Sequence, residues 1–356
     1  MKKHYTIPFF ILHKGCPFKC IFCDQNSITG QDMIKPEDVE KGIEEYLSTI
    51  PPSAERIEVG FFGGTFTGLD PELQKEFLRP VQKYIRKGII KGIRLSTRPD
   101  YINKETLKML KEYSVTCIEL GVQSASDKVL LAAKRGHTAE DTERASGMIL
   151  NEGFILAHQI MLGLPGSNRE EEFHAAKRCK ELGAKEVRIY PVIVIKDTEL
   201  ADLWREEKYE PLDEEEALYR TAIIMLYLQA NDIKVIRCGL HPSEGLIGGS
   251  GFLAGPFHPA FRQKAESLIY SFVLEALLRE QSLIDRISFN PDDEGAFFGF
   301  KGKNSGLIKS LFRPREVILN RDVNIPKGSL YVWRNGKIEM LDRKSIAKRC
   351  KMICDF

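Results

Sequence analysis

Three cysteines near the start of the chain, Cys16, Cys20 and Cys23, constrain its fold more than any other feature. Thiolates are soft ligands, and they are the side chains that hold iron–sulfur clusters. In a cluster of four irons, three cysteines leave one iron without a protein ligand and open to chemistry. Gly15 and Pro17 keep this segment out of regular secondary structure, so the loop can wrap around a cluster. The spacing therefore predicts a 4Fe-4S cluster held by a loop.

A zinc knuckle, a redox pair and buried thiols are the alternatives for these cysteines. A structural zinc site normally has a fourth cysteine or histidine close by, and His13 keeps that alternative open. The other cysteines are dispersed, and we expect most of them to be core or surface thiols. Cys350 and Cys354 have the i, i+4 spacing of one helix face, but the sequence does not tell whether they bind anything.

The pattern C-x3-C-x2-C, with the aromatic residue Phe22 directly before the third cysteine, resembles the signature of the radical S-adenosylmethionine (SAM) superfamily. The resemblance implies that the open iron binds the amino and carboxyl groups of SAM. It also implies that the reduced cluster splits SAM into methionine and a 5′-deoxyadenosyl radical. An electron donor such as ferredoxin or flavodoxin is then the expected partner that reduces the cluster.

The length of 356 residues is enough for two or three domains with a large core. No apolar run is long enough to span a bilayer, so we expect no membrane partner. The N-terminus leads directly into a strand-like run, which we interpret as part of the fold and not as a signal peptide. The three-cysteine loop favours a reducing, cytoplasmic location.

Strand-like and helix-like runs alternate over the first part of the chain. Successive strand–helix pairs favour a parallel sheet. We therefore predict the α/β class, and the resemblance to radical SAM enzymes implies a partial (β/α)6 TIM-like radical SAM barrel over residues 1–200. The expected strands are 5–12, 56–62, 92–97, 115–122, 154–163 and 186–195, and the expected helices are 36–50, 70–87, 104–113, 138–152 and 169–182.

The alternation changes after the barrel. Residues 201–281 are expected to form an accessory α/β region with a long amphipathic helix over 213–229, a strand over 234–238 and a glycine-rich segment. Residues 282–356 are expected to form a small basic α+β domain. From residue 281 to the end, 15 Lys and Arg residues stand against 9 Asp and Glu residues, a net charge of +6. That charge favours an anionic partner, with a solvated basic surface as the alternative.

Glycine and polar residues follow the predicted strands one after another. In parallel α/β barrels the active site lies at the carboxyl ends of the strands, so we predict that these residues lie close together. The candidates for cofactor binding, besides Phe22, are Gly63, Gly64, Thr65, Arg98, Glu119, Gln123 and Leu164.

Each candidate has a chemical reason to bind a cofactor, and each has an ordinary structural role as the alternative. Gly63 and Gly64 let the backbone approach a ligand closely, although a glycine pair is usually just a turn. The resemblance to radical SAM enzymes implies that this strand end binds the methionine amine. Arg98 is suited to binding a carboxylate or phosphate bidentately, although arginines are usually solvated. Glu119 and Gln123 are suited to hydrogen bonds with ribose hydroxyls, and the alternative is that they are ordinary polar residues at the end of a strand.

Five separated motifs occur in the order found in the Elongator catalytic subunit family. The chain resembles the radical SAM domain of that family over roughly residues 5 to 195, and the resemblance implies action on the wobble uridine of tRNA. RNA, and tRNA in particular, is therefore the expected substrate. The motifs are residues 63–67, 97–101, 119–124, 135–138 and 164–166.

The remaining residues contain no acetyl-CoA pyrophosphate loop of the Arg/Gln-x-x-Gly-x-Gly type. The chain therefore resembles a shortened bacterial relative without the acetyltransferase domain, and the carboxymethylation chemistry of the family does not transfer. A radical SAM enzyme that acts on a small molecule such as a tetrapyrrole is the alternative function. A non-catalytic RNA-binding protein with a structural metal is a third.

The sequence Gly299-Phe300-Lys301-Gly302 is a G-x-x-G loop, with Lys303 directly after it. A helix-like run and then a strand follow, and this order resembles a KH domain, whose G-x-x-G loop clamps a single-stranded nucleic-acid backbone. The nearby lysines are suited to phosphate contacts. The resemblance implies a KH-like domain that binds RNA through Gly299, Lys301, Gly302 and Lys303, with a plain surface turn as the alternative.

Overall fold

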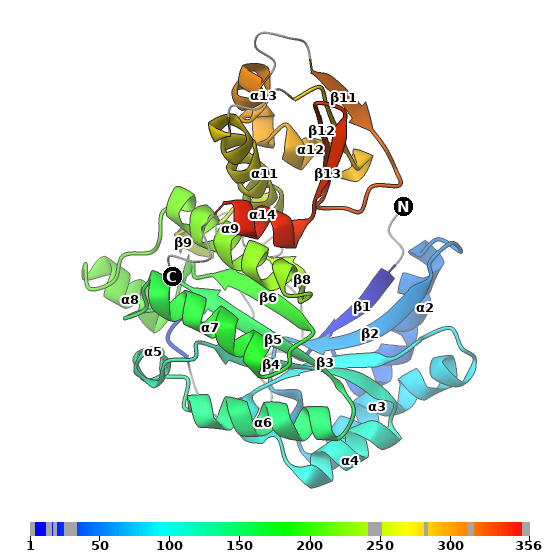
Figure 1. Ribbon diagram of the computed structural model, residues 1–356. Coiled ribbons are helices and arrows are strands. Elements are labelled where there is room, and N and C mark those ends of the chain that lie inside the picture. The colour runs from blue at the N-terminus through cyan, green and yellow to red at the C-terminus, as the bar shows by residue number, and fades with distance from the viewer. Residues whose placement is uncertain are drawn as a thin grey trace. The chain divides into compact units, whose positions relative to one another are not determined.

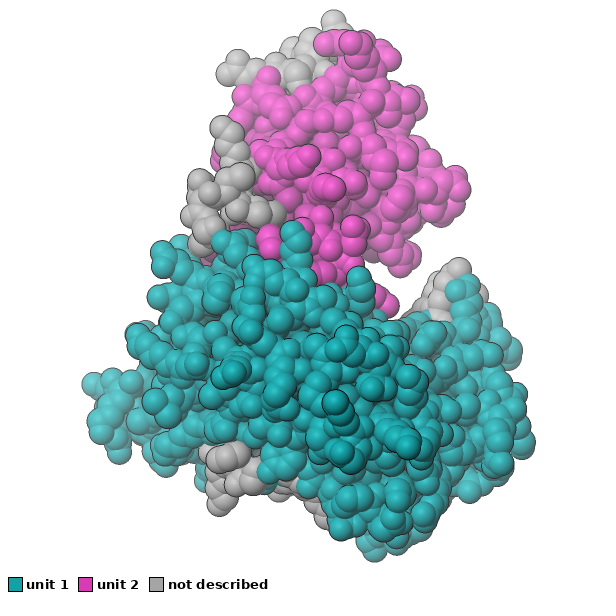
Figure 2. Space-filling model, turned by 60° about the horizontal axis from the view of Figure 1, so that its bottom comes forward, with its two compact units in different colours: residues 1–211, 241–255 teal, residues 212–240, 256–356 magenta. Residues whose placement is uncertain are grey.

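The structure is a computed structural model, which describes residues 4–11, 16, 20–24, 34–240, 251–280, 284–311 and 317–350. The chain divides into two compact units, coloured teal and magenta in Figure 2. Unit 1 comprises Met1–Pro211 and His241–Gly255, and unit 2 comprises Leu212–Leu240 and Pro256–Phe356. Much of the region expected as a separate accessory part therefore clusters with the C-terminal residues in unit 2.

Six parallel strands of unit 1 lie side by side in chain order (Figure 1). Helices alternate with them, so the predicted α/β class with a partial (β/α)6 barrel is confirmed. The strands are β1 (His4–Phe10), β2 (Arg56–Phe62), β3 (Ile93–Thr97), β4 (Val115–Gln123), β5 (Ile155–Leu162) and β6 (Glu186–Pro191). The helices are α2 (Val39–Thr49), α3 (Pro71–Arg86), α4 (Lys104–Glu112), α5 (Asp127–Ala132), α6 (Ala139–Asn151), α7 (Arg169–Glu181) and α8 (Glu199–Arg205).

The two faces of this sheet differ in chemistry because successive side chains of a strand point to opposite faces. On the outer face, Phe61 of β2 is fully buried, and its ring centroid lies 5.9 Å from that of Phe77 in α3. The inner face carries charged side chains, among them Glu58, Arg94 and Glu119, and these are also buried. The apolar face thus holds the helices, and the polar face lines the inside of the half-barrel.

Two predicted elements are wrong in detail. The run expected as one strand over 186–195 divides, because β6 ends at Pro191 and β7 (Val194–Ile195) pairs antiparallel with β9 (Phe252–Ala254). Every residue from Pro191 to Ile195 is buried, so hydrophobicity alone does not locate the break. The helix expected to be amphipathic, α9 (Glu214–Ala230), is buried on all sides over 221–228, as is typical of a core helix.

Unit 2 contains α9, β8 (Lys234–Cys238), α11 (Phe261–Arg279) and a four-stranded sheet. The strand order of that sheet is β11-β10-β12-β13, with β10 parallel to β11 and antiparallel to β12, and β12 antiparallel to β13. Its strands are β10 (Arg286–Phe289), β11 (Ile318–Arg321), β12 (Leu330–Arg334) and β13 (Lys337–Leu341). Its helices are α12 (Glu294–Phe297), α13 (Ser305–Leu311) and α14 (Arg343–Arg349).

Throughout the described ranges, no helix combines the length and apolar character that crossing a membrane requires.

Two neighbouring leucines of α5 provide a matched test of the packing in unit 1. Leu130 is 1% exposed and Leu131 is 80% exposed. Leu130→Ala should lower the free energy of unfolding by about 2–5 kcal/mol, because a buried leucine leaves a cavity. Leu131→Ala should change it by less than about 0.5 kcal/mol. Urea denaturation of both variants measures the difference, and equal losses would contradict the placement of α5.

Candidate functional site

The cysteine loop contacts residues that follow two different strands of unit 1. Cys16, Cys20 and Cys23 are all outside disulfides, with Cys16 exposed, Cys20 buried and Cys23 half-buried. The sulfur of Cys16 lies 3.0 Å from the hydroxyl oxygen of Thr65, which follows β2. Arg135, which follows β4 and α5, donates from Nη1 to the sulfur of Cys20 at 3.2 Å. The thiols of Cys16 and Cys20 therefore lie at the carboxyl-end edge of the sheet.

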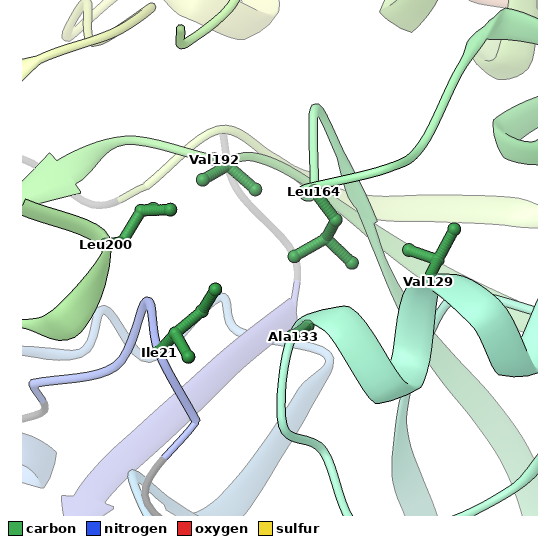
Figure 3. Close-up of a cluster of buried hydrophobic side chains, with 6 residues drawn as sticks. All are labelled: Ile21, Val129, Ala133, Leu164, Val192 and Leu200. Carbon is green, nitrogen blue, oxygen red and sulfur yellow. The ribbon is translucent and has the colours of Figure 1, made fainter. Parts of the chain in front are cut away.

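A cluster of buried apolar side chains anchors this loop (Figure 3). Ile21, between the second cysteine and Phe22, packs into the cluster, and Phe22 packs against it. The backbone N–H of Ile21 donates to the carbonyl of Ala133 at 3.3 Å, and the N–H of Leu200 donates to the carbonyl of Ile21 at 2.8 Å. Leu164, predicted as a cofactor contact, is a buried member of the cluster. The other members are Val129, Ala133, Val192 and Leu200.

The glycine-rich turn after β2 lies beside the cysteine loop through Thr65. Gly63 has φ of +85°, a left-handed conformation that side chains rarely adopt. Thr65 is buried, and it precedes the 3-10 turn Phe66–Gly68. The sequence prediction that this turn approaches the site is consistent with the contact between Thr65 and Cys16.

The guanidinium of Arg98 forms an ion pair with Asp100, which belongs to the same motif. It is buried, and its Nε and Nη2 each donate to a different carboxylate oxygen of Asp100 at 2.9 Å. The bidentate geometry expected for a ligand is thus made with Asp100 in this structure. Binding of a cofactor carboxylate by Arg98 stays a prediction.

Glu119 is fully buried, and its carboxylate accepts four hydrogen bonds from the inner face of the half-barrel. Arg188 donates from Nε at 2.6 Å and from Nη2 at 2.9 Å, Arg94 donates at 2.8 Å and Gln159 at 3.0 Å. Burial raises the pKa of Glu119, but the charges of Arg188 and Arg94 and these hydrogen bonds outweigh it and lower the pKa. The carboxylate is therefore ionised, and a ribose hydroxyl would have to displace one of these donors. The ribose contact stays a prediction.

The same ion network extends to β2. Arg94 donates to Glu58 at 3.3 Å and to Glu186 at 2.8 Å. Glu58 also contacts the imidazole of His4 at 2.8 Å and accepts from Arg56 at 3.0 and 2.6 Å. Burial raises the pKa of Glu58, but the hydrogen bond with His4, the charge of Arg94 and the contacts with Arg56 lower it to about 2.

Three buried polar atoms near the end of β4 have no hydrogen-bond partner within the described part of the chain. They are Oε1 of Gln123, Nε of Arg135 and Nδ1 of His137. Gln123 also has φ of +64°, which is unusual for a residue with a side chain. Unsatisfied buried polar groups destabilise a protein unless a ligand or water completes them. This cluster, beside Cys20 through Arg135, fits a polar ligand.

Arg135 and His137 lie at the candidate site, and the sequence prediction did not include them among its candidates. Their signal was present, since both belong to the 135–138 motif. Burial lowers the pKa of His137 to about 3, and the charges of Arg135 and Arg98 act in the same direction. His137 is therefore neutral at physiological pH, and its Nε2–H donates to the carbonyl of Val122 at 3.2 Å.

The donor set fits an iron–sulfur cluster. All three side chains are soft thiols, which matches the ligand preference of such clusters. No three His, Cys, Asp or Glu side chains in the described ranges converge on a single metal ion. A cluster does not require that convergence, because each cysteine binds a different iron. His13, the zinc alternative, lies outside the described residues.

The G-x-x-G loop lies in unit 2, between α12 and α13. Lys301 and Lys303 are exposed. The N–H of Phe300 donates to the hydroxyl of Ser267 in α11 at 3.1 Å. A Cβ at Gly299 would meet the backbone nitrogen of Asn304 at 2.8 Å, so close packing against Asn304 explains why a glycine stands here. The KH-like assignment and RNA binding by the loop stay predictions.

Comparison with known proteins gives two family matches. Residues 10–193 match the Radical SAM superfamily, and residues 184–271 match the Radical SAM C-terminal domain. The tRNA uridine(34) acetyltransferase of Methanocaldococcus jannaschii is 30% identical over 243 residues, covering 57% of this chain and 45% of the relative. Elongator complex protein 3 of Saccharomyces cerevisiae is 27% identical over 195 residues, covering 49% of this chain and 35% of the relative.

A solved structure agrees with the fold. Elp3 of the archaeon Methanocaldococcus infernus superposes with a TM-score of 0.53 at 23% identity, covering 69% of this chain and 62% of that one. The matched part of the chain spans less than half the length of the two curated relatives above. The likeness therefore concerns the half-barrel and its neighbouring region.

The lowered pKa of Glu58 predicts a defined acid sensitivity. The folded-state pKa of about 2 lies below the ordinary 4.5, so Glu58 contributes stability that is fully present above pH 4.5 and lost as pH falls toward 2. The gap in unfolding free energy between the parent and Glu58→Gln should be constant near neutrality and shrink below pH 4.5, by roughly 3 kcal/mol in total.

Denaturation at a series of pH values measures this gap. The exposed Glu105→Gln is the matched control, with an expected change under about 0.5 kcal/mol near neutral pH. A parent-to-Glu58→Gln gap that stays unchanged between pH 5 and pH 2.5 would contradict the ion network.

Proposed function

Because the chain belongs to the radical SAM superfamily, an enzyme family that uses a 4Fe-4S cluster and SAM, we propose that Cys16, Cys20 and Cys23 hold the cluster and that the enzyme modifies tRNA. The observation that carries the cluster assignment is the placement of the Cys16 thiol against Thr65 and of the Cys20 thiol against Arg135 at the carboxyl ends of the strands. Bound there, the cluster and SAM supply reductive cleavage of SAM, which starts radical chemistry.

The residues around the thiols have distinct tasks in this proposal. Gly63 and Gly64 offer backbone groups to the SAM amine at the turn after β2. Arg135 carries a buried Nε without a partner and suits the SAM carboxylate. Gln123, with its unsatisfied Oε1, suits a hydroxyl donor. Ile21 and its apolar neighbours hold the loop in place and exclude water from one side of it.

tRNA is the proposed substrate because two kinds of observation favour it. The relatives that match the chain are named as a tRNA uridine(34) acetyltransferase and as Elongator complex protein 3. The C-terminal residues from 281 onward carry a net charge of +6, which suits a polyanion. An electron donor such as ferredoxin or flavodoxin is the proposed reductant.

The cluster assignment predicts the behaviour of single cysteine variants. Replacing Cys16, Cys20 or Cys23 with alanine should abolish formation of 5′-deoxyadenosine from SAM in anaerobically reconstituted protein supplied with a reductant, because the cluster loses a ligand. Cys179→Ala is the matched control, since Cys179 is buried in α7 and should leave SAM cleavage intact. Cleavage that survives all three replacements would refute the assignment.

The substrate class is tested by comparing modified nucleosides in RNA from cells with and without the gene. We expect one uridine modification to disappear with the gene, to return with the parent gene and to stay absent with the Cys20→Ala gene. An unchanged nucleoside profile, in cells whose enzyme still cleaves SAM, would refute the tRNA substrate and favour a small molecule.

A further inference from the structure

One face of the four-stranded sheet of unit 2 is rich in aromatic and apolar side chains. Five of its eight residues are exposed, Trp333 and Tyr331 are half-buried, and Ser288 is buried. The strand register aligns two rows of residues across β11, β10, β12 and β13. Since cross-strand partners share a face, we call these eight residues the open face. The rows are Ile318, Arg286, Trp333 and Ile338, followed by Asn320, Ser288, Tyr331 and Met340.

The opposite face of the sheet is covered by helices. Ile287, Phe289, Leu330 and Val332 point to that side and are fully buried. The ring of Phe289 stacks on that of Phe297 in α12 with centroids 4.4 Å apart, and Figure 1 shows α11, α12 and α13 on one side of these strands. The apolar core of this sheet therefore lies between the sheet and the helices, and the aromatic residues of the open face are not part of it.

Large apolar residues of the open face are exposed. Ile338 is 62% exposed, Ile318 is 56% exposed and Met340 is 43% exposed. Ile318 lies on β11 and the other two lie on β13, so the aliphatic side chains lie on the edge strands. Exposed apolar groups that share one face mark a binding surface more often than a chance arrangement.

The centre of the open face combines two rings with one cation. The rings of Trp333 and Tyr331 on β12 meet edge to face, with centroids 6.2 Å apart. The guanidinium carbon of Arg286 on β10 lies 5.4 Å from the ring centroid of Trp333. The eight residues include no carboxylate, and within the described ranges Arg286 has no ion-pair partner. The surface is thus a set of planar groups with one uncompensated positive charge.

We propose that the open face binds single-stranded RNA, with bases stacking on Trp333, Tyr331 and the guanidinium plane of Arg286. Bases unstacked from a helix are recognised by stacking on aromatic rings and arginine planes. The aliphatic side chains of the edge strands then flank the sugars and bases. The choice of RNA rests on the proposed function, and it is supported by charge, since the face and the C-terminal residues around it are positive.

This surface is separate from the G-x-x-G loop. Phe300 of that loop is anchored on Ser267 of α11, and α11 lies on the helical side of the sheet. Variants of the loop and variants of the open face therefore test different surfaces.

The experiment measures binding of a fluorescently labelled, unstructured oligouridylate RNA to the full chain by anisotropy. Trp333→Ala should weaken binding by about fivefold to a hundredfold, the range found for loss of a base–aromatic stack. Trp333→Phe should restore most of the affinity, because a ring remains. Arg286→Ala should weaken binding and reduce the dependence of log affinity on log salt by about one. Val323→Ala is the control, because Val323 is exposed but lies outside the strands.

A second readout uses the tryptophan itself. The chain has two tryptophans, Trp204 and Trp333, so Trp204→Phe leaves Trp333 as the single reporter. RNA should quench its fluorescence in a saturable titration. SAM cleavage and thermal unfolding of each variant verify that the protein is folded.

Two results together would overturn the proposal: the Trp333→Ala variant binds RNA as tightly as the parent, and RNA does not quench Trp333 in the Trp204→Phe variant. If the charge reversals Lys301→Glu and Lys303→Glu then remove binding, RNA binds at the loop, so the open-face inference fails while the tRNA function stands. If sedimentation shows that Trp333→Ala changes self-association and leaves RNA binding unchanged, the face binds a second copy of the chain and the proposal is wrong. A parent that binds no single-stranded RNA also overturns it, whatever the nucleoside comparison shows.

Discussion

The common direction of six strands determines where the candidate site lies. Because β1 to β6 are parallel neighbours, their carboxyl ends meet along one edge, and the loops that follow them meet there too. The cysteine loop follows β1, so it reaches Thr65 after β2 and Arg135 after α5. The apolar contact of Ile21 then holds the loop at this edge.

Buried ion pairs and hydrogen bonds connect the strands on the inner face of the half-barrel. Burying ions costs solvation energy, so a buried ion pair is tolerated only when its remaining donors and acceptors are satisfied. Glu119 meets that condition through Arg188, Arg94 and Gln159. Arg188 of β6 also places its guanidinium 5.0 Å from the ring centroid of Phe62 on β2. The contact of Arg188 with Phe62 thus joins β6 and β2, which are far apart in the sheet order.

The local features of this fold follow from the sequence, and the long-range ones do not. The predicted strand over 56–62 has the same bounds as β2, because an alternating apolar pattern ends at a glycine pair. The division of β6 from β7 was missed, since a continuous buried run carries no periodicity. Arg135 and Cys20 lie 115 residues apart, and Glu119 and Arg188 lie 69 apart. Charged residues with such separations show no common pattern in a single sequence, so the contacts of Glu119 with Arg188 and of Arg135 with Cys20 cannot be predicted from it.

The central claim is that three cysteines hold a four-iron cluster with one iron open to SAM. Mössbauer spectroscopy of anaerobically purified protein labelled with iron-57 tests it most directly. We expect the spectrum of a 4Fe-4S cluster in which the signal of one iron in four changes when SAM is added. Bound zinc in place of iron, or a cluster spectrum that SAM leaves unchanged, would contradict the account.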